Sequence, residues 1–231
     1  MRVDVRFEDG ALVLTDDPAE GGVYRLPRAG EPVDGAARRT LTLAEALHAR
    51  IRPVGTAEAV LREWATRGPR SGSPSAQDPA AAVPTRVRAG ALVIRDDRIL
   101  LIRQTKRRET WYEIPGGGVE AGETLHQAVV RELREETALA GTVREEVARV
   151  WKEGTRQHYF VVHAEGEVGA HEQLDNYGGR PTWMPVADLP ATALWPRRLS
   201  WRIAHWQHTG WPAEPIELAD SVRNLGKPCT W

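Results

Sequence analysis

Three glutamates, Glu132, Glu135 and Glu136, lie close together in the stretch that follows a run of glycines at 116–118. In a helix these three side chains fall within an arc of roughly 100°. Carboxylates held so close repel each other unless a cation lies between them. Mg²⁺ and Mn²⁺ are hard cations that bind through carboxylate oxygens and water. The spacing therefore predicts a site for a divalent metal ion.

A solvated helix face with ion pairs is the commoner explanation of a cluster of glutamates and arginines. Arg131 lies four residues before Glu135 and can pair with it on such a face. This explanation leaves two features unexplained, the run of glycines and the capping pattern described next. We therefore prefer the metal site.

The segment from Thr124 to Thr137 is predicted to be the helix that carries these glutamates. Thr124 and Gln127 have the spacing of a capping box, which marks a helix start. Leu125, Val129 and Leu133 form an apolar stripe at helical spacing that can face a sheet.

Strand patterns surround this helix. Two apolar runs flank Asp96 and Asp97 within residues 85–104, which predicts a hairpin of buried strands. Further strands are predicted at 111–115, 142–151, 157–166 and 181–186, and a last helix from Pro196 to Gly210. Strands and helices that do not alternate regularly indicate an α+β class, with a mixed sheet covered by helices.

The first 68 residues are predicted to form a small α+β domain of unknown role. The alternating pattern around Asp9-Gly10 predicts a hairpin. Two helical patterns follow at 41–51 and 56–68, the second with Thr56 as its N-cap and Gly68 as its stop. Residues 69–85 are rich in Gly, Pro, Ser and Ala and predict a flexible linker. The second domain is then 86–231.

The spacing of the charged residues resembles a family signature. Gly117, Glu123, the run Arg131-Glu132-Leu133 and the pair Glu135-Glu136 fix seven positions over twenty residues. This pattern is similar to the signature of the Nudix hydrolases. The approach "WYEIPGGGVEAGET", the preceding "RAGALVIRDDRILLIR" and the downstream "PTWMPVADLP" also resemble that family. The resemblance covers about residues 86–210.

The resemblance implies a fold and a chemistry. The expected fold is a Nudix-type α/β/α sandwich with a mixed β-sheet. The expected reaction is Mg²⁺- or Mn²⁺-dependent hydrolysis of a nucleoside diphosphate linked to another moiety. In such a reaction the metal neutralises phosphate oxygens and acidifies a water for in-line attack on phosphorus.

The resemblance also implies site residues. Glu135 and Glu136 would be metal ligands, and Glu132 either a further ligand or the general base. The carbonyl of Gly117 would be another ligand, because glycine lets the backbone approach the metal. Arg131 would hold Glu135 and pair with Glu123.

One position departs from the family pattern. The signature has glycine where this chain has Ala138. Glycine usually caps a helix end in the left-handed conformation, and alanine there costs on the order of 1 kcal/mol. Either Ala138 adopts that conformation or the helix continues to Gly141. Alanine at this position affects where the helix ends and leaves the expected metal ligands unchanged.

Other residues are second-rank candidates for substrate binding. Arg103, Arg107 and Arg108 belong to a basic cluster before the glycines, and a solvated loop explains them equally well. Trp111 could stack on a base or a sugar. Glu120 lies in the loop that faces the helix and is a candidate for a metal contact. His158 and His163 lie in a strand pattern that favours structural or surface roles.

Composition limits the partners. A net charge of −1 among 231 residues gives no bulk attraction to nucleic acid or a membrane. The single cysteine, Cys229, excludes an internal disulfide framework and a cysteine-rich zinc site. We expect a cytoplasmic protein with a small-molecule partner, a nucleoside diphosphate derivative. The two-domain organisation is also compatible with a homodimer.

Two rival functions stay open at the level of sequence. A protein of the same fold could bind a nucleotide as a sensor and regulate a partner through its N-terminal domain. The complete set of glutamates argues against a pure sensor. An isomerase on the same fold is disfavoured because no further cysteine lies near the site.

Overall fold

The structure is a computed structural model. It describes the chain except residues 20, 77–82, 153, 171–173, 175–177 and 221–231. Two compact units form, one from residues 1–83 together with Ile216–Ala219, the other from Pro84–Pro215. No helix among the described residues is both long and apolar enough to cross a membrane.

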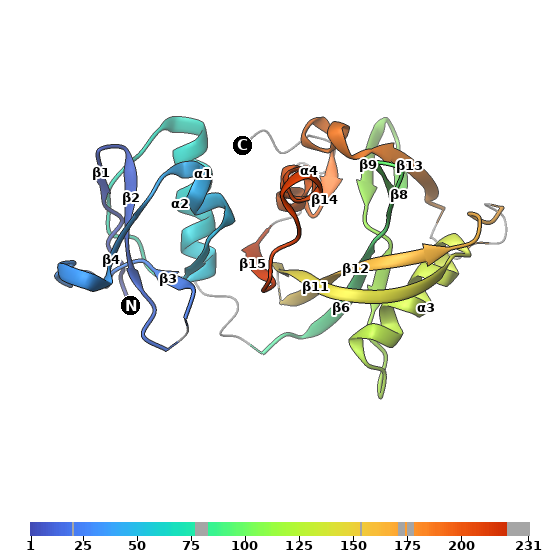
Figure 1. The fold of residues 1–231 in the computed structure, drawn as a ribbon, viewed down its shortest axis with the longest axis horizontal. Coiled ribbons are helices and arrows are strands. Elements are labelled where there is room, and N and C mark those ends of the chain that lie inside the picture. Colours follow the sequence, from blue (N-terminus) through green and yellow to red (C-terminus); the bar gives the residue numbers. More distant parts are fainter. Residues whose placement is uncertain (20, 77–82, 153, 171–173, 175–177, 221–231) are drawn as a thin grey trace. The chain divides into compact units, whose positions relative to one another are not determined.

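The first unit contains a sheet and two helices (Figure 1). Strands β1, β2, β3 and β5 follow one another in the sheet, and β4 pairs with β2. The elements are β1 (Phe7–Glu8), β2 (Ala11–Asp16), β3 (Val23–Arg25), β4 (Arg38–Leu41), α1 (Leu43–His48), β5 (Arg50–Arg52), α2 (Val54–Arg67) and β15 (Ile216–Ala219). The predicted hairpin is present, and both Asp9 and Gly10 have positive φ values of 48° and 79°. Two left-handed residues in succession suit the twist of a two-residue hairpin turn.

Helix α2 begins earlier than the sequence predicts. Its N-cap is Pro53 rather than Thr56, which lies inside the helix. The hydroxyl of Thr56 donates instead to the carbonyl of Ser75, at 3.2 Å. The predicted stop at Gly68 is present, with φ of 85°.

Part of the segment predicted to be a flexible linker is hydrogen-bonded to the first unit. Val5 and Gly72 exchange two backbone hydrogen bonds of 2.8 and 2.9 Å. The amide of Val3 donates to the carbonyl of Pro74, and the amide of Ala76 donates to that of Met1. Residues 72–76 therefore extend the first unit, and residues 77–82 of the predicted linker lie outside the described residues.

The second unit contains two mixed sheets. One has the order β10-β6-β12-β11, in which β12 and β6 are parallel. The other has the order β13-β8-β9-β14, in which β14 and β9 are parallel and β7 pairs with β8. The strands are β6 (Arg86–Leu92), β7 (Ile94–Arg95), β8 (Arg98–Lys106), β9 (Glu109–Glu113), β10 (Gly116–Gly118), β11 (Ala140–Lys152), β12 (Thr155–Glu165), β13 (Arg180–Pro185) and β14 (Leu194–Trp195).

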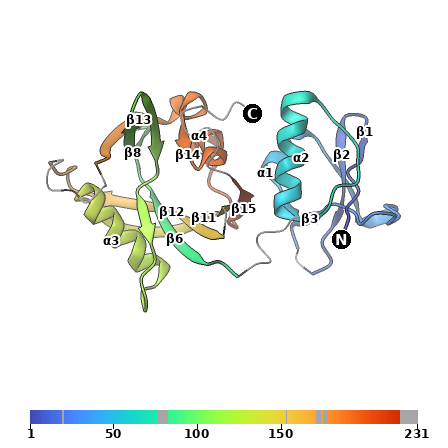
Figure 2. The same cartoon turned by 180° about the vertical axis from the view of Figure 1, so that it is seen from behind.

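Two helices cover these strands. Helix α3 (Leu125–Thr137) packs against β6, β10 and β11, while α4 (Ser200–Thr209) follows the 3-10 turn Arg197–Leu199. The front and back views place α3 and α4 on opposite sides of β11 and β12 (Figures 1 and 2). The α+β class predicted from the sequence is confirmed.

The apolar stripe predicted on α3 faces the sheet. Val129 and Leu133 are fully buried, and Leu125 packs against the same cluster. Their partners are strand residues of 89–100 and 160–164 together with Leu139. Burial of side chains of this size stabilises the unit by about 1.5–3 kcal/mol each. This packing fixes the orientation of the helix face that carries the glutamates.

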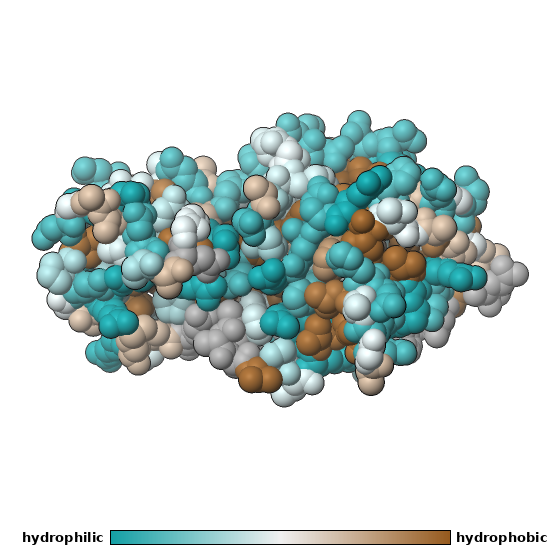
Figure 3. All heavy atoms as spheres, turned by 60° about the horizontal axis from the view of Figure 1, so that its bottom comes forward, coloured by the Kyte–Doolittle hydropathy of each residue, from teal (hydrophilic) through white to brown (hydrophobic). Residues whose placement is uncertain are grey.

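The surface is mostly polar between scattered apolar groups. On the face drawn in Figure 3, hydrophilic residues predominate, and several apolar residues gather over the second unit. Among the described residues, the large apolar side chains that are exposed are Met1 and Val83. Single exposed apolar residues are ordinary on a folded protein.

Candidate functional site

The N-terminus of α3 is fixed by the predicted capping box. The Thr124 hydroxyl accepts from the amide of Gln127 at 3.2 Å, and the Gln127 side chain accepts from the amide of Thr124 at 2.9 Å. Two amides that the helix cannot satisfy internally are thereby paired. The helix therefore starts at a defined residue, which sets the position of every side chain after it.

The C-terminus of α3 is closed by Ala138. This residue adopts the left-handed conformation with φ of 65° and ψ of 5°, and its amide donates to the carbonyl of Arg134. Of the two helix ends that the sequence left open, the structure has the earlier one. The turn lets Leu139, which is fully buried, enter the core before β11 begins.

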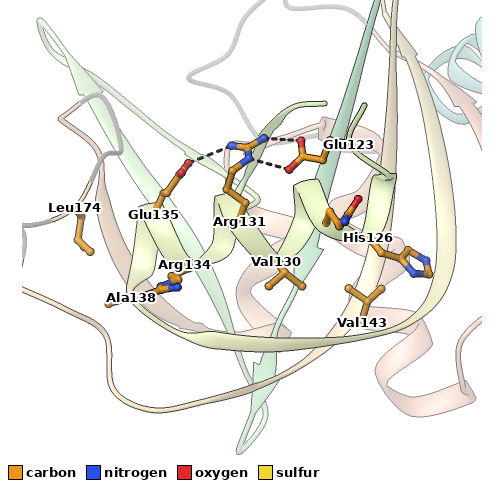
Figure 4. Close-up of a pocket in the computed structure, with 10 residues that line it drawn as sticks. Glu123, His126, Val130, Arg131, Arg134, Glu135, Ala138, Val143 and Leu174 are labelled. Atoms are coloured by element: carbon orange, nitrogen blue, oxygen red, sulfur yellow. Dashed lines mark hydrogen bonds and ion pairs between the residues drawn. The ribbon is translucent and has the colours of Figure 1, made fainter. Parts of the chain in front are cut away.

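Arg131 is the centre of an ion-pair network on α3 (Figure 4). Its guanidinium donates twice to the carboxylate of Glu123, from Nε and from Nη2, at 2.9 Å each. Its Nη1 lies 3.0 Å from Oε1 of Glu132 and 3.1 Å from Oε2 of Glu135. Its Nη2 also donates to the carbonyl of Gly118 at 2.9 Å. Arg131 thus ties the glycine strand, the following loop and the helix together.

This network shifts the pKa values of Glu123 and Arg131. The hydrogen bonds from Arg131, followed by one from the amide of Glu120, hold the pKa of Glu123 below its usual range. The same pairing with Glu123 raises the pKa of Arg131. Both groups are therefore charged across the neutral range, and the bidentate pair keeps a fixed geometry.

Glu136 lies in a different environment from Glu135. Its side chain is buried, and its Oε2 accepts a hydrogen bond from the amide of Gly116 at 2.8 Å. Burial raises the pKa of Glu136 to about 8; the Gly116 hydrogen bond opposes this, and the nearby charge of Glu132 adds to it. Glu135, in contrast, has a side chain that is 46% exposed.

Glu132 lies directly against the backbone of Gly117. A Cβ atom added at Gly117 would lie 1.9 Å from Oε1 of Glu132, a distance at which two atoms cannot coexist. Only glycine therefore leaves room for this carboxylate. The absence of a side chain, expected at this position from the sequence, is required by the structure.

The three glutamates do not meet at a single point in this arrangement. Among the described residues, no group of three or more His, Cys, Asp or Glu side chains is placed to hold a metal ion. Arg131 lies between Glu132 and Glu135, and Glu136 is paired with Gly116. In this arrangement the carboxylates pair with a guanidinium and a backbone amide, and the metal site predicted from helical spacing stays a prediction.

The donor set nevertheless fits a hard divalent cation. Glu132 and Glu136 are near enough for the charge of one to raise the pKa of the other, which is the repulsion that a cation relieves. Glu132 also touches the backbone of Gly117. The available donors are all oxygen atoms, the kind that Mg²⁺ and Mn²⁺ prefer.

The second-rank residues are mostly remote from this network. Arg103, Arg107 and Arg108 are exposed in the hairpin of β8 and β9. Within the described part of the chain, no hydrogen bond or ion pair joins them to the glutamates of α3. Glu120 is exposed and contributes its backbone amide to Glu123 at 3.0 Å.

Trp111 belongs to a neighbouring group instead. Its indole N–H donates to Oε1 of Glu113 at 2.8 Å, so its polar edge is engaged within β9. His158 is buried and its Nδ1 lies 2.6 Å from Oε1 of Glu146, whereas His163 is exposed. These positions agree with the structural and surface roles favoured for the two histidines.

Sequence reasoning missed Arg88. Its Nη2 donates to the carbonyl of Gly116 at 2.8 Å, so it holds the strand that contacts Glu136. The sequence did indicate a basic face on this strand. Arg86 and Arg88 are two positions apart in an otherwise apolar strand, so their side chains lie on the same face. The pairing of β6 with β10 that brings this face to Gly116 is a long-range contact.

A large open cavity of about 1010 Å³ lies on the outer side of α3 (Figure 4). Glu123, Arg131 and Glu135 line it together with apolar side chains such as Val130 and Val143. Its lining includes neither Glu132 nor Glu136. Although this cavity is large, it is therefore not the place where Glu132 and Glu136 would act.

Much of the second unit is similar in sequence to known proteins. Residues 84–204 match the sequence profile of the NUDIX domain. The chain is 40% identical over 90 residues to the CTP pyrophosphohydrolase of Escherichia coli, covering 36% of this chain and 66% of that protein. It is 31% identical over 105 residues to the NAD-capped RNA hydrolase NudC of Photobacterium profundum, covering 44% and 38% of the two chains. With the ADP-ribose pyrophosphatase of Methanocaldococcus jannaschii it shares 42% identity over 59 residues, covering 25% and 35%.

These matches thus span from about a third to two thirds of the length of the relatives.

Proposed function

Because this chain belongs to the NUDIX domain family, we propose that it hydrolyses the phosphoric anhydride of a nucleoside diphosphate linked to another group. One observation carries the proposal: two coupled carboxyls, Glu132 and Glu136, lie against the side-chain-free backbone of Gly116 and Gly117. A solvated helix face would not need this contact. Two of the relatives are named for different nucleotide substrates, ADP-ribose and CTP. We therefore propose the class of reaction and do not specify the leaving group.

Mg²⁺ or Mn²⁺ is the proposed cofactor. The carboxylates of Glu132 and Glu136 and the carbonyl of Gly117 would hold it, with Glu135 as a further ligand once its carboxylate leaves Arg131. When bound, such an ion supplies neutralisation of the phosphate oxygens and a more acidic water.

The remaining residues position these donors. Arg131 keeps Glu132 in place and is itself locked by the bidentate pair with Glu123. Gly117 allows the substrate and the carboxylate to approach the backbone. Glu132 or Glu135 would accept the proton of the attacking water, because both carboxylates pair with Arg131, whereas that of Glu136 is buried and paired with the amide of Gly116.

A screen of substrate classes tests the proposal. Nucleoside triphosphates, sugar nucleotides, ADP-ribose, dinucleoside polyphosphates and coenzymes would each be incubated with Mg²⁺, and phosphate measured after coupling to a phosphatase. We expect turnover of at least one class, abolished by EDTA and restored by excess Mg²⁺. If no class is turned over while a nucleotide raises the melting temperature, the protein is a nucleotide-binding sensor instead.

A further inference from the structure

Strand β10 consists of three glycines, so it has no side chains that could anchor it by packing. It lies at the edge of its sheet and pairs with β6, where Gly116 is opposite Gly90 and Gly117 is opposite Ala89. Glycine loses more conformational freedom on folding than any other residue. The position of this backbone therefore depends on the sheet pairing and on side chains that bond to it from neighbouring elements.

The two strands approach each other closely at Gly116. A Cβ atom added to Gly116 would lie 2.2 Å from the carbonyl oxygen of Ala89 and 2.6 Å from Cα of Gly90. A Cβ atom added to Gly90 would lie 2.9 Å from the ring of Tyr159. No side chain can be accommodated at either glycine, so any further support for this backbone must come through hydrogen bonds to its amides and carbonyls.

Two arginines supply such hydrogen bonds. Arg131 of α3 donates to the carbonyl of Gly118 at 2.9 Å, and Arg88 of β6 donates from Nη2 to that of Gly116 at 2.8 Å. Arg131 also pairs with three carboxylates. Arg88 differs, because among the residues that the structure describes its guanidinium bonds to the Gly116 carbonyl and forms no ion pair.

Gly116 joins Arg88 to Glu136. Its carbonyl, in the peptide plane after it, accepts from Arg88, and its amide, in the plane before it, donates to Oε2 of Glu136 at 2.8 Å. The two planes are linked by the φ and ψ torsions of a glycine, which side-chain sterics do not restrict. Burial raises the pKa of Glu136 and the charge of Arg88 opposes that rise, so the two side chains lie near each other.

We propose that Arg88 is a positioning residue, which fixes the backbone of Gly116 so that its amide holds the carboxyl of Glu136 where it acts. The inference rests on the proposed function and adds to it a residue that acts through Gly116 rather than on the substrate. Without this guanidinium, the torsions of Gly116 are less restrained and the Glu136 carboxyl loses a fixed partner. Small displacements of such a group reduce turnover strongly.

Two substitutions of Arg88 test the inference by kinetics. Arg88→Met keeps most of the length and removes the charge and the donors, whereas Arg88→Lys keeps a charge and a donor. We expect Arg88→Met to lower kcat by about tenfold or more and to leave KM within about twofold, because no substrate contact is lost. Arg88→Lys should recover most of kcat. Arg86→Met is the matched control, since it removes a guanidinium from the same face of β6 and leaves the bond to Gly116 in place.

Amide hydrogen exchange, followed by NMR in EDTA, gives a readout that needs no turnover. The amide of Gly116 should exchange about tenfold faster in Arg88→Met, as expected for the loss of one supporting hydrogen bond. It should exchange at the wild-type rate in Arg88→Lys and in Arg86→Met. The amide of Ala128, which donates to the carbonyl of Thr124 in α3, should exchange alike in all variants and so report any general loss of stability.

The outcomes separate this inference from the proposed function. If the Gly116 amide exchanges alike in the wild type and Arg88→Met, or if that variant raises KM and keeps kcat, the inference is wrong and the proposed function stands. Equal losses of kcat in Arg88→Met and Arg86→Met would also overturn it. If the wild type cleaves no anhydride, the proposed function fails, and exchange alone decides whether Arg88 fixes Gly116. Arg88→Gln, with a shorter side chain, replaces Arg88→Met if the latter does not fold.

Discussion

Gly117 shows how a single residue decides the position of a reactive group. The carboxylate of Glu132 occupies the space that any side chain at residue 117 would need. Arg131 holds the same carboxylate from the other side, at 3.0 Å. The position of Glu132 is therefore set by one contact and one ion pair, and either can be changed by mutation.

We predict that Gly117→Ala lowers kcat by about a hundredfold, because a new methyl group displaces the Glu132 carboxylate and a displacement of about 1 Å can cost that much. The measurement is steady-state turnover of the best substrate from the screen. Gly118→Ala is a matched control in the same strand, where an added Cβ would lie 3.4 Å from the nearest atom, on Arg86. It keeps the carbonyl that Arg131 contacts and should retain most of the turnover. Equal losses in both variants would contradict the role given to Gly117.

For single residues, the sequence predicted ion pairs between side chains that are a few positions apart in the chain. The ion pair of Arg131 with Glu135 follows from helical spacing, and the structure contains it. The network with Gly118, and the contact of Glu136 with Gly116, join a strand to a helix across a long loop. Spacing along one helix could not show that the amide of Gly116 would donate to Glu136.

Helix α3 is the element whose limits depend most on local sequence. Its N-terminus was predictable because a capping box involves only residues three positions apart. Its C-terminus was not, because alanine is an unfavourable left-handed residue and Gly141 offered another end. The burial of Leu139 decides in favour of Ala138, and such burial is a tertiary effect. Thr56 failed as an N-cap for a similar reason, since its hydroxyl donates to Ser75 rather than to its own helix.

We predict that Ala138→Gly stabilises the protein by about 1 kcal/mol, because glycine adopts the left-handed conformation without the steric cost that alanine bears. Urea denaturation followed by circular dichroism would measure the free energy of unfolding. The control is Ala140→Gly, at an exposed position of β11 in which glycine should destabilise. A loss of stability in both variants would show that the helix end is not strained.

At the scale of the whole molecule, the second unit has a core of its own. Among the residues that the structure describes, the buried members of the apolar cluster behind α3 come from 89–164. Composition indicated a boundary near residue 85, and we retain that boundary as a proposal. Composition could not reveal that residues 72–76 bond to residues 1–5, because these are backbone hydrogen bonds that do not depend on the type of side chain.

We predict that residues 84–231, produced alone, fold cooperatively and keep the carboxyl network, since all described residues of that cluster belong to the second unit. Circular dichroism and a single urea transition would test folding. Turnover of the fragment would test the site. An insoluble fragment, or one without a cooperative transition, would show that the two units share one folding unit.

The substitution Glu136→Gln tests the central claim, that the carboxyls of Glu132 and Glu136 on α3 serve anhydride hydrolysis. We predict that it lowers kcat by at least about a hundredfold at saturating Mg²⁺, the scale of losing a group that stabilises the transition state. The free energy of unfolding in EDTA should stay the same or rise, because a crowded, buried carboxyl is replaced by a neutral amide. Glu145→Gln, an exposed acid of β11 outside the network, should leave kcat intact. Full turnover by Glu136→Gln, with folding unchanged, would contradict the account.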